Sequence, residues 1–420
     1  MSVAHVIIGA NYGDEGKGLL TDYFASFAPG ETMVVRFNGG AQAGHTVVAP
    51  DGRRHVFSHF GAGSFSGCTT YLSRFFIVNP IVFVREHKQL IDLGLVPKVI
   101  ISSRALLTTP YDIFINQSLE LMRGESRHGS CGLGINETVT RCLRDPRLKT
   151  EAGDMFAIPR LRQKLLELGR SWLPHRIDEL GIDCTSSRAA AFLVNQDLIV
   201  EQFLEDLRGL KQLAVIAKDI PESSNFVFEG AQGLLLDEDR IDQWPFVTRS
   251  RTGLKNVLFL SNQMQIDHLN VTYVSRSYLT RHGAGPLNGE ADWHFDDTTN
   301  VENRFQGKLR FAPLDLNQLR QSVDLDLRCA KGSGLSIEAS LAITCCDQIP
   351  LPAGLDAGIP IRYNSFGPSR LDVQPVTDCP RVYFQPASNS LLHAALPLAE
   401  MENQKVDPLP TSLLTPTSPP

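Results

Sequence analysis

The chain has 420 residues, of which 42% are hydrophobic and 20% are charged, and this composition excludes a collagen-like chain and a chain that is disordered throughout. The 40 Lys and Arg residues stand against 46 Asp and Glu, a formal net charge of −6, so a general nucleic-acid-binding or polybasic membrane-binding surface is not expected. We therefore expect any bound phosphate to be held locally, by a few groups.

The eight cysteines are scattered, with no CxxC pair and no zinc-like spacing. This pattern indicates reduced thiols and favours a cytoplasmic protein. The N-terminus lacks the pattern of a signal peptide, and the longest apolar stretch, residues 75–84, is too short to span a bilayer. We expect neither a membrane nor a nucleic acid as a partner.

The first predicted element is a buried parallel strand at residues 3–10, followed by a helix over 19–27 and a second strand over 32–37. Further strands are predicted at residues 98–102, 225–229, 271–275 and 341–344, with helical patterns at 160–168 and 189–207. Strands that alternate with helices predict an α/β fold, with a large, mostly parallel central sheet flanked by helices.

One catalytic body is expected over residues 1–370, because the apolar periodicity fades beyond that point. Residues 371–420 are expected to form a C-terminal extension. Its last part is rich in Pro, Ser and Thr, a composition that cannot bury a core, so we expect disorder toward the end.

A glycine-rich turn with the sequence GANYGDEGKG, residues 9–18, follows the first predicted strand. Its backbone N–H groups can surround an anion at a helix N-terminus, and Lys17 adds a positive charge. The turn departs from a P-loop, because six residues separate its flanking glycines and Gly18 replaces the hydroxyl residue. Two carboxylates, Asp14 and Glu15, lie inside it. We interpret it as a modified phosphate loop in which Asp14 does chemistry; the alternative is a plain turn capped by acidic residues.

The segment NGGAQAGHT, residues 38–46, follows the second predicted strand. Its small residues allow close approach of a ligand to the backbone, and it carries one imidazole, His45. A lone histidine is more often structural than catalytic. This one, however, is expected at the carboxyl end of a strand, where open α/β sheets bind ligands. Asp14 and His45 are therefore candidates for an acid–base pair acting on one substrate.

These two segments resemble the adenylosuccinate synthetase family, whose patterns are close to GDEGKGK and RFxGGxNAGHT. The resemblance continues in order down the chain, at FEGAQGLLLD (228–237), PFVT (245–248), TRHGAGP (280–286) and SFGPSR (365–370). It implies a P-loop-related α/β fold, a homodimer and a carbon–nitrogen ligase (EC 6.3.4) that joins L-aspartate to a 6-oxopurine nucleotide, driven by a nucleoside triphosphate and Mg²⁺.

The resemblance also implies the roles of the reacting residues. Asp14 would remove the N1 proton of the purine, and the activated O6 would attack the γ-phosphate. His45 would stabilise or protonate that oxygen, while Lys17 would neutralise the transferred phosphate. Asp14 and the carbonyl of Gly44 would contact Mg²⁺. The amine of aspartate would then displace the phosphate from C6.

Three sets of binding residues follow from the same resemblance. For the phosphate donor the set is Gly13, Glu15, Gly16, Lys17, Gly18, Gly44, His45, Thr46, Asp347, Gly367 and Pro368. For the acceptor nucleotide it is Asp14, Gln42, Ser130, Cys131, Arg141, Gln232 and Thr248, with Arg141 as a replacement for an arginine lent across the dimer. For aspartate it is Thr298, Thr299, Asn300 and Arg304.

Several positions depart from the family patterns. Cys345 stands where the base-reading motif TKxD has its lysine, and Asp347 is retained. This departure favours ATP or dATP over GTP as the donor. For Cys345 and Cys346 themselves, a buried strand end that carries two thiols is the alternative. The loop at 129–135 has lost two threonines and an arginine.

The set of departures resembles a phage branch of the family that takes dGMP and makes N6-succino-2-amino-2′-deoxyadenylate for diaminopurine DNA. We therefore expect dGMP as the acceptor and, if a phage encodes the chain, the host cytoplasm as its location. The alternative is an ordinary adenylosuccinate synthetase that uses IMP and GTP. A nucleotide-binding regulator without catalysis is the rival from another class, although binding alone does not need both Asp14 and His45.

Overall fold

The computed structural model of the chain describes residues 2–124, 128–295, 307–351, 355–377 and 383–384. Residues 1–386 form one compact unit, and a second unit, residues 387–420, falls outside the described residues. The first unit thus continues past residue 370, where the sequence suggested that the body ends. The reason is a three-residue edge strand, β16 (Val373–Pro375), which is too short to produce a detectable pattern.

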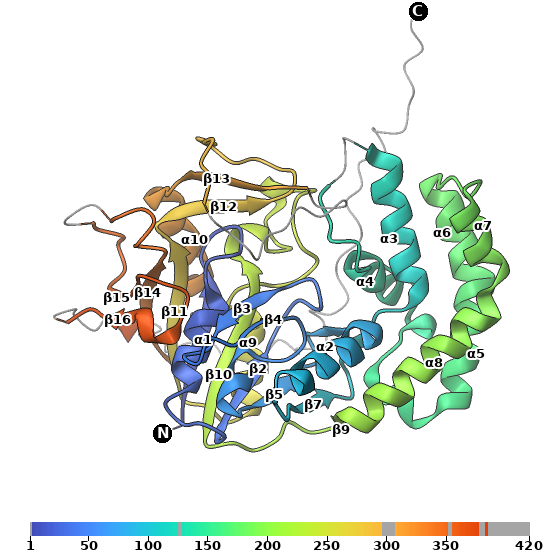
Figure 1. Cartoon of the computed structure of the whole chain (residues 1–420), viewed down its shortest axis with the longest axis horizontal. Coiled ribbons are helices and arrows are strands. Elements are labelled where there is room, and N and C mark those ends of the chain that lie inside the picture. Colours follow the sequence, from blue (N-terminus) through green and yellow to red (C-terminus); the bar gives the residue numbers. More distant parts are fainter. Residues whose placement is uncertain (1, 125–127, 296–306, 352–354, 378–382, 385–420) are drawn as a thin grey trace, which may run out of the picture. The chain divides into compact units, whose positions relative to one another are not determined.

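The central sheet contains 11 strands in the described part of the chain. With β16, they are β1 (Val3–Gly9), β2 (Thr32–Arg36), β5 (Thr69–Leu72), β7 (Lys98–Ser102), β9 (Val215–Ala217), β10 (Asn225–Gly233), β11 (His268–Arg276), β14 (Ser336–Thr344), β15 (Ile361–Ser365) and β17 (Tyr383–Phe384). Their order is β16-β15-β14-β11-β1-β10-β2-β5-β7-β9, with β17 paired to β14 (Figure 1). Among the described strands of this central sheet, only the pairs β15–β16 and β14–β17 are antiparallel, which confirms the expected mostly parallel sheet.

Among the residues that the structure describes, three small two-stranded sheets lie outside the central one. Two are antiparallel: β3 (His45–Val48) with β4 (Arg54–Phe57), and β12 (Tyr278–His282) with β13 (Leu309–Pro313). The third is parallel and joins β6 (Ile77–Val78) to β8 (Leu106–Leu107). The first two matter for the site, because they follow its loops directly in the chain.

The described part of the chain contains ten α-helices, some of which cover the two faces of the central sheet. They are α1 (Lys17–Ala25), α2 (Pro80–Asp92), α3 (Pro110–Arg123), α4 (Ile135–Arg144), α5 (Ile158–Glu167), α6 (Leu173–Leu180), α7 (Ser187–Val194), α8 (Gln196–Leu213), α9 (Leu254–Gln263) and α10 (Leu316–Arg328). Figure 1 shows α5 to α8 grouped beyond the β7–β9 edge. Among the described residues, no helix is both long and apolar enough to cross a membrane.

The single helix predicted over 189–207 is wrong, because the chain breaks it at Asn195 into α7 and α8. The side-chain amide of Asn195 donates to the carbonyl of Ala191 at 2.7 Å. Asparagine competes with helical hydrogen bonding in this way, so a long helical pattern can contain a turn.

Alternate residues of the central strands pack on opposite faces of the sheet. Ile7 and Val274 pack with Leu20 and Phe24 of α1 on one face. The next side chains along the strands face α9 and α10 and join a second, larger buried cluster. Because both faces of the sheet are covered, these strands have continuous apolar sequences. Their positions could therefore be predicted from the sequence.

His5 in β1 provides a test of this burial by pH. Its ring stacks on Phe24 with the centroids 4.3 Å apart, and burial, reinforced by His268, lowers the pKa of the imidazole to about 4. An unfolded histidine titrates near about 6.5. The stability contributed by neutral His5 is therefore fully present above about pH 6.5 and is lost as the pH falls toward 4. We expect His5→Gln to reduce the loss of unfolding free energy between pH 7 and 4.5 by about 2 kcal/mol. Urea unfolding of both proteins at the two pH values measures this, and an identical loss in both would contradict it.

Candidate active site

The three motif segments meet at the edge of the central sheet that is formed by the carboxyl ends of its strands. Strands β2, β10 and β1 are neighbours and run parallel, so their carboxyl ends lie together. Loop 10–16 follows β1, loop 37–44 follows β2, and Gln232 stands near the end of β10. Open α/β sheets bind ligands at such an edge.

The turn after β1 depends on residues that tolerate left-handed backbone. Gly13, Asp14 and Gly16 have φ angles of 95°, 63° and 94°. Asp is among the few non-glycine residues that adopt this region readily. A Cβ on Gly18 would approach the carbonyl oxygen of Thr46 to 2.9 Å, so the larger residue of a P-loop does not fit there.

Glu15 and Lys17 form a buried ion pair inside this turn. The Lys17 ammonium lies 2.6 Å from the Glu15 carboxylate, and both side chains are about 97% buried or more, with exposed fractions of 3% and 2%. Glu15 also accepts hydrogen bonds from the backbone N–H groups of Asn11 (3.1 Å) and Gly13 (2.7 Å). Glu15 therefore stabilises the turn from within. Contact of Lys17 with a phosphate remains a prediction. It requires that the Lys17 ammonium either binds Glu15 and the phosphate together or breaks its ion pair with Glu15.

Asp14 forms an ion pair with an arginine that the sequence motifs did not identify. Arg276, the last residue of β11, donates to the Asp14 carboxylate at 2.5 Å and to the Asp14 carbonyl at 2.6 Å. Burial lowers the pKa of Arg276, but Asp14 together with Cys345 and Tyr278 outweighs burial and raises it, so the guanidinium stays charged. The Asp14 side chain is 21% exposed and therefore remains accessible to a ligand.

His45 is held by a second acidic residue, Glu229 of β10. The ring Nδ1 lies 2.6 Å from a Glu229 carboxylate oxygen. The other Glu229 oxygen accepts from the backbone N–H of Ala62 at 3.1 Å and lies 3.9 Å from Nε of the fully buried Arg36. Burial raises the pKa of Glu229, but His45 and Arg36 outweigh it and lower the pKa, so this carboxyl stays ionised.

The protonation state of His45 follows from these contacts. Burial lowers the pKa of the imidazole to about 4, although Glu229 opposes the shift, so the ring is neutral at pH 7. A neutral ring beside an ionised carboxylate donates its Nδ1 proton to Glu229 and keeps a lone pair on Nε2. This Nε2 is buried and has no hydrogen-bond partner. It can take up a proton or, once protonated, donate one.

The expected acceptor-binding residues surround Gly39. A Cβ on Gly39 would lie 3.4 Å from Oε1 of Gln232 and 3.7 Å from Nε2 of Gln42. The Gly39 N–H donates to the hydroxyl of Ser250 at 2.9 Å, and Ser250 lies two residues after Thr248. The structure thus brings Gln42, Gln232 and the segment of Thr248 together.

The loop after α3 joins the same region. A Cβ on Gly40 would lie 2.8 Å from Cδ1 of Ile135, the first residue of α4. In the preceding loop, the Ser130 hydroxyl accepts from the side-chain amide of Asn116 at 2.8 Å, and burial raises the pKa of the Cys131 thiol to about 11. Cys131 is therefore a neutral thiol near the candidate acceptor region.

Arg141 is the one described member of the acceptor set that the structure removes from the site. It is fully buried, and its guanidinium forms a bidentate pair with Asp112 at 2.8 and 2.9 Å. The remaining donors bind the carbonyls of Leu107 and Leu148 and the hydroxyl of Thr150. Arg141 therefore fixes α4 to its neighbours, and the expectation that it is lent across a dimer is corrected.

Three of the expected donor-binding residues, Asp347, Gly367 and Pro368, follow the ends of β14 and β15. The Thr344 hydroxyl donates to the carbonyl of Glu15 at 2.8 Å, which ties the end of β14 to the turn. Gly367 and Pro368 follow β15, and a parallel bridge between Ser369 and Val48 brings β3 beside them. Asp347 is exposed at this end of the sheet.

The two adjacent cysteines differ in their surroundings. Cys346 is buried in the cluster under α9 and α10, as the alternative of a buried strand end predicted. Cys345 is half-buried, has a φ angle of 59°, and its carbonyl accepts from the Ser277 hydroxyl at 2.9 Å. Only Cys345 is therefore placed to affect a ligand.

The four expected aspartate-binding residues, Thr298, Thr299, Asn300 and Arg304, lie outside the described residues. Their role stays a prediction. The closest described neighbour in the chain is Phe295, whose ring stacks on that of Tyr278 with centroids 4.5 Å apart.

A magnesium ion fits the donor set near Asp14. In the described part of the chain, no three His, Cys, Asp or Glu side chains gather as a metal site. Mg²⁺, however, is usually bound by one or two carboxylates together with substrate phosphates and water. The part-exposed carboxylate of Asp14 can supply such a ligand, and the carbonyl of the exposed Gly44 stays a predicted one.

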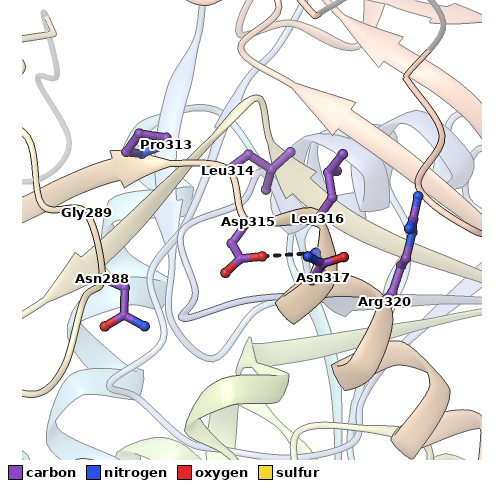
Figure 2. A pocket seen from close by; sticks show the side chains of 8 residues that line it. All are labelled: Asn288, Gly289, Pro313, Leu314, Asp315, Leu316, Asn317 and Arg320. Carbon is purple, nitrogen blue, oxygen red and sulfur yellow. Dashed lines mark hydrogen bonds between the residues drawn. The ribbon is translucent and has the colours of Figure 1, made fainter.

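A pocket of about 570 Å³ lies elsewhere, between the loop at Asn288 and the start of α10 (Figure 2). Asp315 there caps the helix by accepting from the backbone N–H of Asn317 at 3.0 Å. None of the lining residues belongs to the motif segments, so this pocket does not mark the candidate site.

Comparison with known proteins gives the same family as the motifs. The family model described as adenylosuccinate synthetase matches residues 6–324. The adenylosuccinate synthetase of Psychrobacter sp. is 31% identical over 371 residues, 84% of this chain and 80% of that protein. That of Picrophilus torridus is 32% identical over 284 residues, 67% of this chain, and the match spans 63% of its length.

Two solved structures share the fold. The fully ligated adenylosuccinate synthetase from Plasmodium falciparum has a TM-score of 0.63 at 17% identity, covering 89% of this chain and 100% of that one. The succinoaminodeoxyadenylate synthetase of cyanophage S-2L, bound to dGMP and dATP, has a TM-score of 0.58 at 16% identity, covering 89% and 95%.

The fold and the site thus define an α/β protein with a glycine-rich turn after its first strand, and with the ion pair Asp14–Arg276 and the pair His45–Glu229 at the carboxyl ends of its central strands. Within that class, the chain belongs to the adenylosuccinate synthetase family, a family of carbon–nitrogen ligases.

Proposed function

We propose that the chain is a ligase that joins L-aspartate to C6 of a 6-oxopurine nucleotide through a 6-phosphoryl intermediate, driven by a nucleoside triphosphate. The observation that carries the proposal is the meeting of Asp14 with the His45–Glu229 pair at one sheet edge, in a chain of this family. A binding protein needs a phosphate cradle, but it does not need a base and an oriented imidazole beside the cradle.

The first step activates the purine. Asp14 takes the proton from N1, and the electron pair moves to O6, which forms a bond to the γ-phosphorus as the bond to the leaving nucleoside diphosphate breaks. Nε2 of His45 is the buried, unpartnered group available to O6. Phosphate charge near the ring favours its protonated form, and Glu229 stabilises the resulting imidazolium.

The second step replaces oxygen by nitrogen. The amine of aspartate attacks C6, the C6–O6 bond breaks, and O6 leaves as part of inorganic phosphate. A lactam oxygen is a poor leaving group until it is phosphorylated, so the order of steps follows from the chemistry. The chain's contribution is positioning and charge neutralisation, the usual source of catalysis in phosphoryl transfer.

Mg²⁺ would neutralise charge on the donor phosphates when it is bound. Asp14 and the carbonyl of Gly44 would hold it, together with phosphate oxygens. A homodimer remains a prediction from the family.

For the acceptor we propose dGMP. Both polar atoms of the Gln42 amide and Oε1 of Gln232 are buried without a partner in the ligand-free chain. As placed, Oε1 of Gln42 and Oε1 of Gln232 are two acceptors that await donors. IMP presents N1–H alone on that edge of its base, and Asp14 takes it. A guanine adds a 2-amino group with two N–H donors. The cyanophage protein bound to dGMP lends further support.

The alternative acceptor is IMP, and the names of the curated relatives favour it. A matrix of acceptors (dGMP, GMP, IMP) against donors (ATP, dATP, GTP), scored by aspartate-dependent phosphate release, separates the two. We expect dGMP to have the highest kcat/KM, because a site built to bind the 2-amino group leaves a buried polar group unpaired with IMP. A higher kcat/KM for IMP would identify an ordinary adenylosuccinate synthetase. No aspartate-dependent release with any pair would refute the ligase.

The same matrix tests the donor. Because Cys345 replaces a lysine that would pack on guanine, GTP loses a contact and keeps only the exposed Asp347 for recognition of its base. We expect ATP and dATP to support turnover at least as well as GTP. Strict dependence on GTP would contradict this reading of Cys345.

A further inference from the structure

The contact between Arg276 and Asp14 conflicts with the two roles proposed for Asp14, as a base and as a ligand of Mg²⁺. A carboxylate oxygen that accepts a charge-assisted hydrogen bond from a guanidinium is less available to bind a metal ion or a substrate than one that faces water. Arg276 takes one oxygen of this carboxylate and the carbonyl of the same residue. Catalysis therefore requires that the pair loosens, while Asp14 keeps its place in the turn.

Arg276 has a second anchor that allows it to loosen. Its Nη1 donates to the hydroxyl of Tyr278 at 2.8 Å, and the guanidinium carbon lies 5.5 Å from the centre of the Tyr278 ring. The Tyr278 hydroxyl donates in turn to the side-chain carbonyl of Gln348 at 2.5 Å. The guanidinium can therefore release the carboxylate and still keep its contacts with Tyr278 and with the Asp14 carbonyl.

The hydrogen bond from Arg276 to the backbone carbonyl of Asp14 has a separate effect. Asp14 has a φ angle of 63°, a conformation that most side chains avoid. Arg276 donates to the carbonyl of that residue, and the Thr280 hydroxyl donates to the neighbouring carbonyl of Gly13 at 3.0 Å. These two contacts hold the turn in the conformation that presents the Asp14 carboxylate to the sheet edge.

We propose that Arg276 is a positioning residue for Asp14, which neutralises its carboxylate in the ligand-free chain and yields that carboxylate to Mg²⁺ when the metal binds. The guanidinium and the metal ion compete for the same oxygen, while the hydrogen bond to the Asp14 carbonyl persists. The proposal rests on the proposed function only in assigning Asp14 to the metal.

Binding of Mn²⁺ alone, followed by the loss of its free electron paramagnetic resonance signal, tests the competition without any turnover. Arg276→Gln removes the competing charge, so we expect it to bind Mn²⁺ about fivefold tighter than the unaltered chain, which corresponds to about 1 kcal/mol. The double variant Asp14→Asn/Arg276→Gln should lose the gain. Arg362→Gln, which removes another part-buried arginine paired with a carboxylate, Glu338, is the matched control and should change nothing.

Unchanged or weaker Mn²⁺ binding by folded Arg276→Gln overturns the proposal, as does a gain that survives in the double variant. Arg276→Lys covers the case in which Arg276→Gln does not fold. Lysine keeps the charge but cannot reach carboxylate and carbonyl together, so a smaller gain, about twofold, is expected. Unchanged Mn²⁺ binding by Arg276→Lys would overturn the proposal, as it would for Arg276→Gln.

Steady-state kinetics supply the second readout. We expect Arg276→Gln to lower kcat about tenfold or more with a smaller change in KM, because the turn loses its anchor, and Arg276→Lys to restore part of kcat. An equal fall for Arg276→Lys and Arg276→Gln would overturn the positioning role. If the unaltered chain releases no phosphate with aspartate, the proposed function fails, yet the Mn²⁺ comparison still decides the role of Arg276.

Discussion

Asp14→Asn is expected to lower kcat by about 10²–10⁴-fold, the usual contribution of a general base, and by more if the metal contact is lost as well. Asparagine has nearly the same shape and tolerates the left-handed backbone at this position, so the turn should persist. Nucleotide affinity should change much less than kcat. Steady-state turnover together with calorimetric binding of the acceptor nucleotide measures both quantities.

Asp154→Asn is the matched control for this variant. Its side chain is 24% exposed and pairs with Lys164 at 2.7 Å, much as Asp14 is 21% exposed and pairs with Arg276. The control should keep its full rate. A rate near that of the unaltered chain in Asp14→Asn would remove Asp14 from the chemistry.

Glu229→Gln is expected to lower kcat by about 10²–10⁴-fold, because an amide can donate to Nδ1 of His45 and so stabilise the wrong tautomer of the ring. The same change removes the charge of Glu229 beside the buried Arg36 and leaves only the weaker effect of Glu86, and a buried pair that loses one partner costs about 3–5 kcal/mol of stability. Turnover must therefore be read at a temperature where thermal unfolding shows the variant folded.

His45→Asn separates the two effects of Glu229. It removes the imidazole but leaves Glu229 beside Arg36 at 3.9 Å, so stability should fall less while kcat falls by a similar factor. Full activity of His45→Asn would show that the buried imidazole is structural, which is the more common role of a lone histidine.

The sequence predicted the fold and the meeting of the motifs for a physical reason. Strands that are covered on both faces are continuous apolar runs, and the runs at 3–10, 32–37 and 225–229 correspond to β1, β2 and β10. In a parallel sheet, whatever follows such strands lies at one edge. Asp14, His45 and Gln232 could therefore be placed together before the structure was known.

The partners of these residues could not be predicted, because they come from distant parts of the chain. Glu229 is 184 residues from His45, and Arg276 is 262 residues from Asp14. Glu229 ends the predicted strand 225–229 and Arg276 directly follows the predicted strand 271–275, and such a position is a weak signal of a site residue. A motif names the reacting residue, but only the packed sheet shows which charge lies beside it.

Arg141 illustrates the opposite error. The resemblance to the family suggested that Arg141 is available to a neighbouring subunit. The partner that buries it, Asp112, lies in α3 and belongs to none of the quoted motifs. Availability of a charged side chain depends on burial and partners, and local sequence carries little information on either.

The most direct test of the account follows the oxygen atom. An acceptor nucleotide labelled with ¹⁸O at C6 is turned over with aspartate and an unlabelled nucleoside triphosphate, and the inorganic phosphate is analysed by mass spectrometry. If O6 attacks the γ-phosphorus and leaves with it, each phosphate carries one ¹⁸O and the product carries none. Unlabelled phosphate, with the label released to water or kept in the product, would contradict a 6-phosphoryl intermediate and with it the roles of Asp14 and His45.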